Sequence, residues 1–157
     1  MGKELIFHST VTWTGNLGTG TSTTKAFSRD LVIECHGKPP IMGSTAPAFG
    51  GDPGRYDPED LLVASLSSCH MLWYLDLAAE AGVVVTAYQD AARGTMALGR
   101  GGAGQFTEAI LSPEITITTT SDAEKAASLH ERAHEMCYVA RSVNFPVRVE
   151  PVIRKEA

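Results

Sequence analysis

The stretch that decides the fold is DPEDLLVASLSSCHMLWYLDLAAEAG, residues 57–82. It opens with Asp57 at the N-cap position and Pro58 at the first helical position, and acidic residues fill the first turn. It closes on Gly82, a residue type that commonly follows a helix end. We therefore predict a helix over residues 58–81. Its apolar side chains fall on nearly all sides, which is typical of a buried helix and predicts the central helix of the fold.

The segments on either side of this helix indicate strands and one more helix. The loop at 36–56 holds too many prolines and glycines for a helix or a central strand. A capping box from Ser121 to Glu124 opens a second helix, predicted over 122–139. The predicted strands are 5–14, 21–35, 83–98, 106–120 and 143–152. The order β-β-α-β-β-α-β predicts the α+β class, with helices packed on an antiparallel sheet, in a single domain spanning residues 1–157.

Composition narrows the class of protein. With 43% hydrophobic and 20% charged residues, the chain has the profile of a soluble globular protein. Its net charge of −5 argues against nucleic acid or an anionic membrane as a partner. No uncharged apolar run reaches 18 residues, so no membrane span is predicted. The first eight residues lack a signal-peptide core, so we expect a cytoplasmic location, where cysteine pairs are transient rather than structural.

Two cysteines have settings that favour thiol chemistry. Cys69 follows two serines and precedes His70 inside the long apolar helix pattern, and Cys137 follows His134 near the end of the second helix. Each could instead be a small buried hydrophobe, the usual role of a lone helical cysteine. A disulfide between them needs Cα atoms within about 7 Å. Cys35 has no such neighbours, and we interpret it as structural.

A competing motif is His130-Glu131-Arg132-Ala133-His134, which fits the H-E-x-x-H pattern of zinc proteases. On a helix it places two imidazoles on one face, with the glutamate between them. No histidine follows His134 to serve as a third ligand. A second possible zinc set would use Cys69, Cys137 and His134, without any supporting spacing.

Glu59 either stabilises the helix dipole from the first turn or serves as a catalytic carboxylate. It lies ten residues before Cys69, about 15 Å along a straight helix. If Glu59 serves the thiol, it would come most simply from a second subunit, which predicts an obligate dimer.

Two sequence blocks resemble the family of osmotically inducible protein C and organic hydroperoxide resistance proteins (OsmC/Ohr). Residues 57–62 followed by 64–70 resemble that family's N-P-E-x-L…C helix, including the ten-residue step from Glu to Cys. Residues 133–137 followed by Ser142-Val143 resemble its A-H-x-x-C block. The resemblance implies the OsmC-like α+β fold, with antiparallel sheets wrapped around long central helices in an intertwined homodimer.

The resemblance also implies an activity, a thiol-dependent peroxidase for organic hydroperoxides of the alkyl or fatty-acid type. Cys69 would be the peroxidatic cysteine, Cys137 the resolving cysteine that forms a disulfide with it, and Glu59 the site carboxylate. The reductant would be an external dithiol, lipoyl-type in relatives, and no metal or other cofactor is implied.

One departure from the family concerns a cation. Relatives carry an arginine in the loop after the first strand, whereas residues 15–20 here contain none. Arg29 or Arg55 would replace it, and Arg29 is the preferred substrate-binding candidate. Two other functions remain open: a non-catalytic or redox-sensing binder of small apolar ligands, and a zinc hydrolase using His130, Glu131 and His134.

Overall fold

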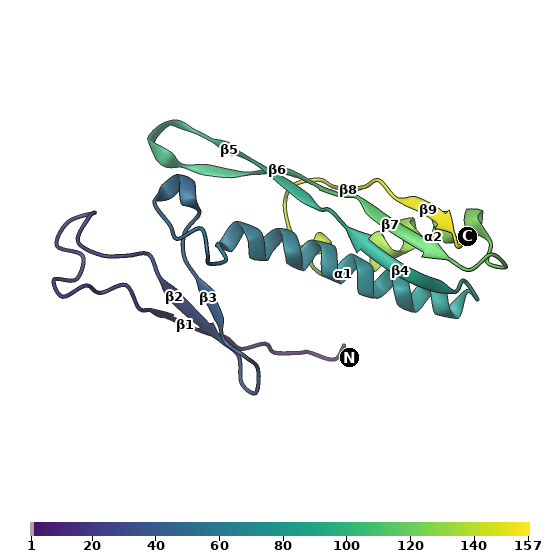
Figure 1. The fold of residues 1–157 in the computed structure, drawn as a ribbon, viewed down its shortest axis with the longest axis horizontal. Helices are drawn as coiled ribbons and strands as arrows, with labels where there is room; N and C mark the ends of the chain where they lie inside the picture. The colour runs from purple at the N-terminus through teal and green to yellow at the C-terminus, as the bar shows by residue number, and fades with distance from the viewer. Residues whose placement is uncertain (1) are drawn as a thin grey trace. The chain divides into compact units, whose positions relative to one another are not determined.

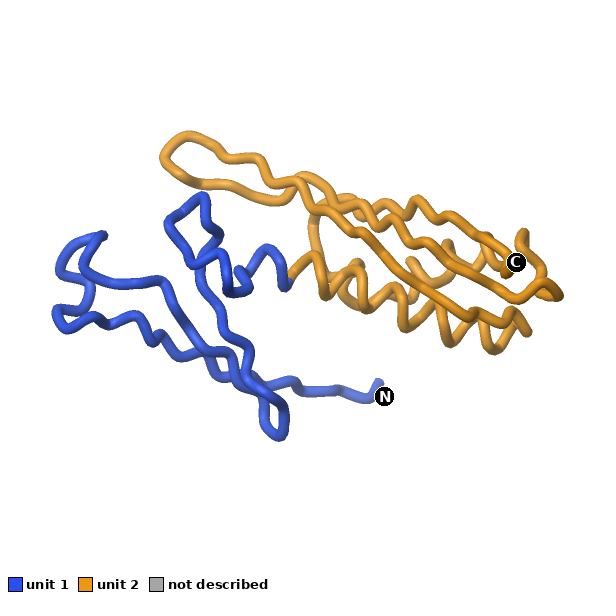
Figure 2. Tube along the Cα trace, viewed as in Figure 1, with its two compact units in different colours: residues 1–61 blue, residues 62–157 orange. Residues whose placement is uncertain are grey.

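The computed structural model describes residues 2–157, which form two compact units. The first ends at Leu61 and the second begins at Leu62 (Figure 2). We describe each unit by itself. The expectation of a single domain over residues 1–157 stays a prediction.

The N-terminal unit is built on a small antiparallel sheet. Its strands are β1 (Thr10–Trp13), β2 (Leu31–Glu34) and β3 (Ile41–Gly43), in the order β1-β2-β3, and a short 3-10 helix, η1, covers Pro47–Phe49. Among residues 2–61, no apolar residue other than glycine is buried. A three-stranded sheet without a covered hydrophobic face has little independent stability, so this unit needs another surface to pack on.

The strands of this unit are shorter than predicted. The predicted strand 21–35 is extended only at its end, because residues 21–26 form turns, in which Ala26 N donates to Thr23 O at 3.1 Å. In the turn before it, the Asn16 side chain accepts hydrogen bonds from Gly18 and Gly20. Both glycines have positive φ angles, which other residues rarely adopt. The loop at 36–56 contains β3, whose Gly43 pairs with Tyr56. β3 is an edge strand of the sheet, so the prediction that this loop holds no central strand stands.

The long helix α1 (Pro58–Glu80) is confirmed to within one residue. Asp57 and Asp60 cap its start reciprocally, each accepting a hydrogen bond from the other's backbone N–H. At its end Gly82 has a φ of 72°, and Val83 N donates to Ala78 O at 2.9 Å, a Schellman motif.

Only one stripe of α1 is buried within the chain. The buried residues repeat every fourth position: Leu66, His70, Tyr74 and Ala78. The prediction of burial on all sides is therefore wrong for a single chain, and Leu72 is 60% exposed. By length and composition this helix could cross a membrane, with a mean hydropathy of 1.3 over 18 residues, although the core helix of a soluble protein meets the same criterion.

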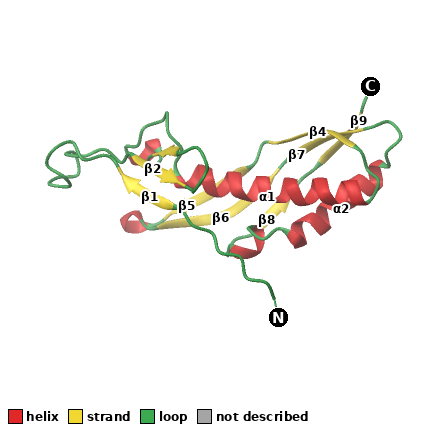
Figure 3. Cartoon of the chain, turned by 90° about the horizontal axis from the view of Figure 1, so that it is seen from below, coloured by secondary structure: helices red, strands yellow, loops and turns green. Residues whose placement is uncertain are grey.

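The C-terminal unit places two helices on one face of strongly twisted strands (Figures 1 and 3). Its second helix is α2 (Ala123–Met136), and the 3-10 helices η2 and η3 cover Arg100–Gly102 and Ala140–Ser142. Its strands are β4 (Val85–Asp90), β5 (Arg93–Leu98), β6 (Gly104–Leu111), β7 (Pro113–Ile117), β8 (Val147–Val149) and β9 (Val152–Lys155). They form two sheets, β4-β7-β9 and β5-β6-β8.

Each long strand predicted in this unit is two strands that belong to different sheets. Asp90 marks one of these breaks, because its Oδ1 accepts a hydrogen bond from Ser112 N, at 2.7 Å, between β6 and β7. β8 and β9 pair in parallel with β6 and β7, so the sheets are mixed rather than purely antiparallel. The α+β class is confirmed.

The start and end of α2 differ slightly from the prediction. Asp122, not Ser121, is the N-cap, since its Oδ1 accepts from the backbone N–H groups of Glu124 and Lys125. Ser121 is buried and bonds to Val84 N instead. The helix ends at Met136, which makes Cys137 its C-cap residue.

The hydrophobic core of this unit joins the helices to the sheets. One cluster combines Tyr74 and Ala78 of α1 with strand β7 and with the inner face of α2. A second packs Leu66 of α1 against Ala109 and Leu111 of β6. The core thus fixes the contact between α1 and α2, where both candidate cysteines lie.

Candidate functional site

Cys69 and Cys137 meet where α1 faces the end of α2. The Cys69 side chain is half-buried, whereas Cys137 is fully buried, and neither is in a disulfide. The two thiols are neighbours, close enough for Cys69 to influence the pKa of Cys137. Burial raises the pKa of the Cys137 thiol to about 11, and the neighbouring Cys69 adds to this effect. Cys137 is therefore a protonated thiol at neutral pH.

The backbone after α2 holds the Cys137 sulfur in place. Ala140 N donates to Cys137 Sγ at 3.4 Å, within the turn that leads into η3. Because Cys137 ends the helix rather than continuing it, a backbone N–H of the following turn can reach its sulfur.

An open, mainly apolar pocket of about 270 Å³ lies beside Cys69. Its lining residues are Cys69, Leu72, Trp73, Asp76 and Tyr138. The rings of Trp73 and Tyr138 pack edge to face, with centroids 5.6 Å apart. The pocket thus gives an apolar molecule access to Cys69, while Cys137 is withdrawn from solvent.

Two buried histidines connect α1 and α2 close to the cysteines. His70 Nε2 and His130 Nδ1 are 2.9 Å apart, and the His130 ring stacks on Tyr74 at 4.0 Å between centroids. Burial lowers the pKa of His70 to about 4 and that of His130 to about 3. Around His70, the positive charge of His134 lowers its pKa further, whereas the Asp90 carboxylate opposes the shift. Both rings are therefore neutral at pH 7.

The H-E-x-x-H residues do not form a metal-binding arrangement in this structure. His130 Nδ1 is engaged by His70, and Glu131 is exposed. Among residues 2–157 no three His, Cys, Asp or Glu side chains are grouped so that they could hold a metal ion. This applies equally to the set Cys69, Cys137 and His134.

The remaining predicted site residues belong to the N-terminal unit. Glu59 is half-buried in the first turn of α1. Arg29 donates to the carbonyl oxygens of Thr24 and Phe27 and lies 4.6 Å above the Phe27 ring. Arg55 pairs with Asp30 and Asp52. Their roles stay predictions.

Some residues around the site were not identified from the sequence. Ser67 donates to Asp90 Oδ2 at 2.5 Å and ties α1 to β4, and Tyr88 of β4 lies against Tyr74. No local motif marks Asp90 or Tyr88, because only the tertiary fold brings β4 against α1. The His70–His130 contact likewise joins positions 60 residues apart.

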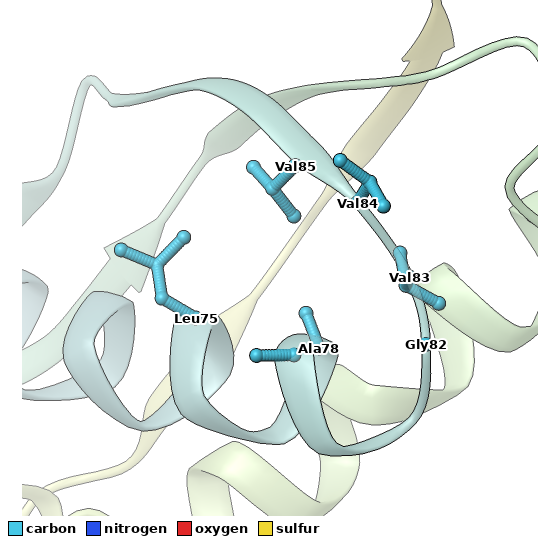
Figure 4. A pocket seen from close by; sticks show the side chains of 7 residues that line it. Leu75, Ala78, Gly82, Val83, Val84 and Val85 are labelled. Atoms are coloured by element: carbon cyan, nitrogen blue, oxygen red, sulfur yellow. The ribbon is translucent and has the colours of Figure 1, made fainter.

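A second pocket, of about 390 Å³, lies at the other end of α1 (Figure 4). It is lined by Leu75, Ala78, Ala79, Gly82, Val83, Val84 and Val85. None of these side chains is titratable or nucleophilic, so the pocket offers no group for catalysis.

Comparisons with known proteins agree on the family. A family model described as OsmC-like protein matches residues 50–152. The fold is similar to that of an OsmC-like protein of unknown function from Vibrio cholerae, with 31% identity, a TM-score of 0.85, and coverage of 95% of this chain and 100% of that one. No curated protein matches the chain significantly.

More distant structures share the fold. An organic hydroperoxide resistance protein from Elizabethkingia anophelis has 18% identity and a TM-score of 0.70, with 99% of this chain and 100% of that chain covered. A protein from Legionella pneumophila, described as organic hydroperoxide resistance protein OsmC, has 16% identity and a TM-score of 0.67, over 96% and 98% of the two chains. The family match to residues 50–152 and the 31% identical structure together show that this chain belongs to the OsmC-like protein family.

Proposed function

We propose that the protein is a thiol-dependent peroxidase that reduces organic hydroperoxides of the alkyl or fatty-acid type. The observation that carries this proposal is the contact between a half-exposed thiol, Cys69, and a fully buried one, Cys137, beside an apolar pocket. Hydroperoxide resistance proteins of the same fold support it.

The difference in burial supports a different proposed role for each thiol. The Cys69 thiolate lines the pocket and attacks the outer oxygen of the hydroperoxide, breaking the O–O bond. Cys69 becomes a sulfenic acid, and the alkoxide takes up a proton and leaves as an alcohol. Cys137 lies beside Cys69, yet its raised pKa keeps it protonated and unreactive toward the peroxide.

The second step joins the two sulfurs. Cys137 attacks the Cys69 sulfenic acid, its proton leaves with the hydroxide as water, and a Cys69–Cys137 disulfide forms. An external dithiol, of the lipoyl type, then reduces the disulfide by two exchange steps and is itself oxidised. No metal or bound cofactor takes part in the proposed cycle, and the reducing cytoplasm is the proposed location.

Two further residues belong to the proposal through the family resemblance. Glu59 is proposed as the carboxylate that orients the thiolate, and Arg29 as the cation that replaces the family's loop arginine. The buried stripe of α1 leaves its other faces unpacked, and the N-terminal unit lacks a buried apolar core among its described residues. Both features favour the intertwined homodimer that the resemblance implies.

The test is consumption of cumene hydroperoxide with dihydrolipoamide as the reductant. The wild-type protein should turn over, and Cys69→Ser should lose at least about a hundredfold of that activity, because no other thiol lines the pocket. Cys35→Ser is the matched control and should keep wild-type activity, since Cys35 is not among the residues that line the pocket. Turnover retained by Cys69→Ser would refute the peroxidase. No turnover with any dithiol would favour the redox-sensing or ligand-binding function instead.

A further inference from the structure

The buried histidine pair lies on the same helix contact as the two cysteines. His70 directly follows Cys69 in α1, and His130 precedes Cys137 by two helical turns in α2. Figure 3 shows the two helices side by side. His70 is 0% and His130 4% exposed, so neither ring is available to a substrate.

Several contacts make this pair sensitive to the register of the two helices. The His70 and His130 rings are almost parallel, at 9°, and joined by the 2.9 Å hydrogen bond. Tyr74, one turn after His70, stacks on the same His130 ring and donates its hydroxyl to Ala126 O at 3.0 Å. A shift of α2 along α1 by one residue's rise, about 1.5 Å, would break both the hydrogen bond and the stacking.

Stability alone gives no reason for two imidazoles here. Within residues 2–157, His70 Nδ1 and His130 Nε2 have no hydrogen-bond partner although both are buried. Unpartnered buried polar atoms destabilise a core, whereas two apolar side chains of similar shape would avoid this cost. A buried hydrogen bond between two helices favours the one helix arrangement in which it can form.

We propose that the His70–His130 hydrogen bond is a positioning device, which holds the thiols of Cys69 and Cys137 at the separation and orientation that disulfide formation needs. A disulfide requires Cα atoms within about 4.4–6.8 Å and a narrow dihedral range, so small helix shifts matter. This inference rests on the proposed disulfide, but it concerns how the two helices present the sulfurs rather than which oxidant attacks.

The first test is the equilibrium between the Cys69–Cys137 disulfide and dithiothreitol buffers, which needs no peroxide. His130→Phe keeps a ring to stack on Tyr74 but removes the hydrogen bond. We expect it to lower the disulfide equilibrium constant about tenfold, or about 30 mV. His130→Asn can place an amide atom near the former Nδ1, and it should restore the constant to within about threefold of wild type. His36→Phe, at an exposed histidine, is the control.

The second test separates positioning from folding. His70→Phe combined with His130→Phe replaces the pair by two apolar rings, so the thermal midpoint should be kept while the disulfide constant stays low. With cumene hydroperoxide, the single variant His130→Phe and the double variant should form the Cys69 sulfenic acid at the wild-type rate. Dimedone should trap more of this sulfenic acid than in the wild type, because its condensation with Cys137 is slower. A wild-type disulfide constant in either variant would overturn the positioning role. If the protein does not react with the peroxide but the variants still lower the disulfide equilibrium constant, only the peroxidase proposal would be refuted.

Discussion

At the level of single residues, Cys69 and Cys137 differ in exposure, and this difference predicts what each does when its partner is removed. In Cys137→Ser, the Cys69 sulfenic acid has no thiol to condense with. We therefore expect it to persist or to oxidise further to sulfinic acid after about one turnover. Intact-protein mass spectrometry after peroxide treatment should show additions of one or two oxygens instead of the loss of two hydrogens. A disulfide mass in this variant would contradict the resolving role.

The two buried histidines predict an acid-sensitive fold. Their pKa values in the folded chain, about 4 for His70 and about 3 for His130, lie below the ordinary value of 6.5. Below pH 6.5 the unfolded chain therefore binds protons that the folded chain does not, so stability falls as the pH drops from 6.5 toward 4. Each histidine should cost about 2 kcal/mol between pH 7 and pH 5.

Urea unfolding at several pH values measures this effect. His134 and Asp90 also influence the pKa of His70. The comparison is therefore with the variant that carries phenylalanine at positions 70 and 130. Its free energy of unfolding should vary much less over this pH range, and a slope as steep as that of the wild type would exclude the buried pair as the source.

The sequence allowed only part of this site to be predicted. Cys69 and Cys137 were found because both lie in local motifs with recognisable spacing. The neutral, buried state of His130 was not predicted, because the H-E-x-x-H pattern gives the position on the helix and not the partner. His70 of α1 is that partner, and only the tertiary fold brings it there.

At the level of elements, the N-cap of α2 is a point where a local change should have a measurable effect. Asp122 Oδ1 accepts two backbone hydrogen bonds, at 2.9 and 3.1 Å. Asp122→Ala should destabilise the fold by about 1 kcal/mol, measured by urea unfolding. Asp122→Asn keeps an acceptor oxygen and should cost much less. Equal losses in the two variants would show that charge, not capping, matters at this position.

Helices were predicted more accurately than strands for a physical reason. The ends of α1 are determined by local hydrogen bonds at Asp57 and Gly82, which the sequence displays directly. The breaks within the long strands depend on sheet pairing and on contacts such as Asp90 with Ser112, between residues 22 positions apart. Alternating apolar residues indicate an extended chain but not where it passes from one sheet to another.

At the level of the whole molecule, apolar side chains are unevenly distributed between core and surface. Among residues 2–157, all fully buried hydrophobic side chains belong to the C-terminal unit, whereas Val11, Trp13 and Met42 on the N-terminal sheet are between 44 and 60% exposed. Leu72 of α1 is 60% exposed as well. Apolar surface of this extent on several elements marks an interaction site. In the homodimer implied by the family resemblance, a second copy of the chain would cover this surface.

A dimer predicts that folding depends on protein concentration. If the exposed faces of α1 and of the N-terminal sheet pack on a partner, the denaturation midpoint should rise as the protein concentration rises. Light scattering should give twice the chain mass of 16.7 kDa at micromolar concentration. Leu72→Arg places a charge on the exposed face of α1 and should weaken association by about tenfold or more, because an unpaired charge is costly to bury. Leu72→Met conserves volume and should leave association unchanged. A wild-type chain that scatters as a monomer would refute the dimer, and with it the assignment of Glu59 to the Cys69 site of a neighbouring subunit.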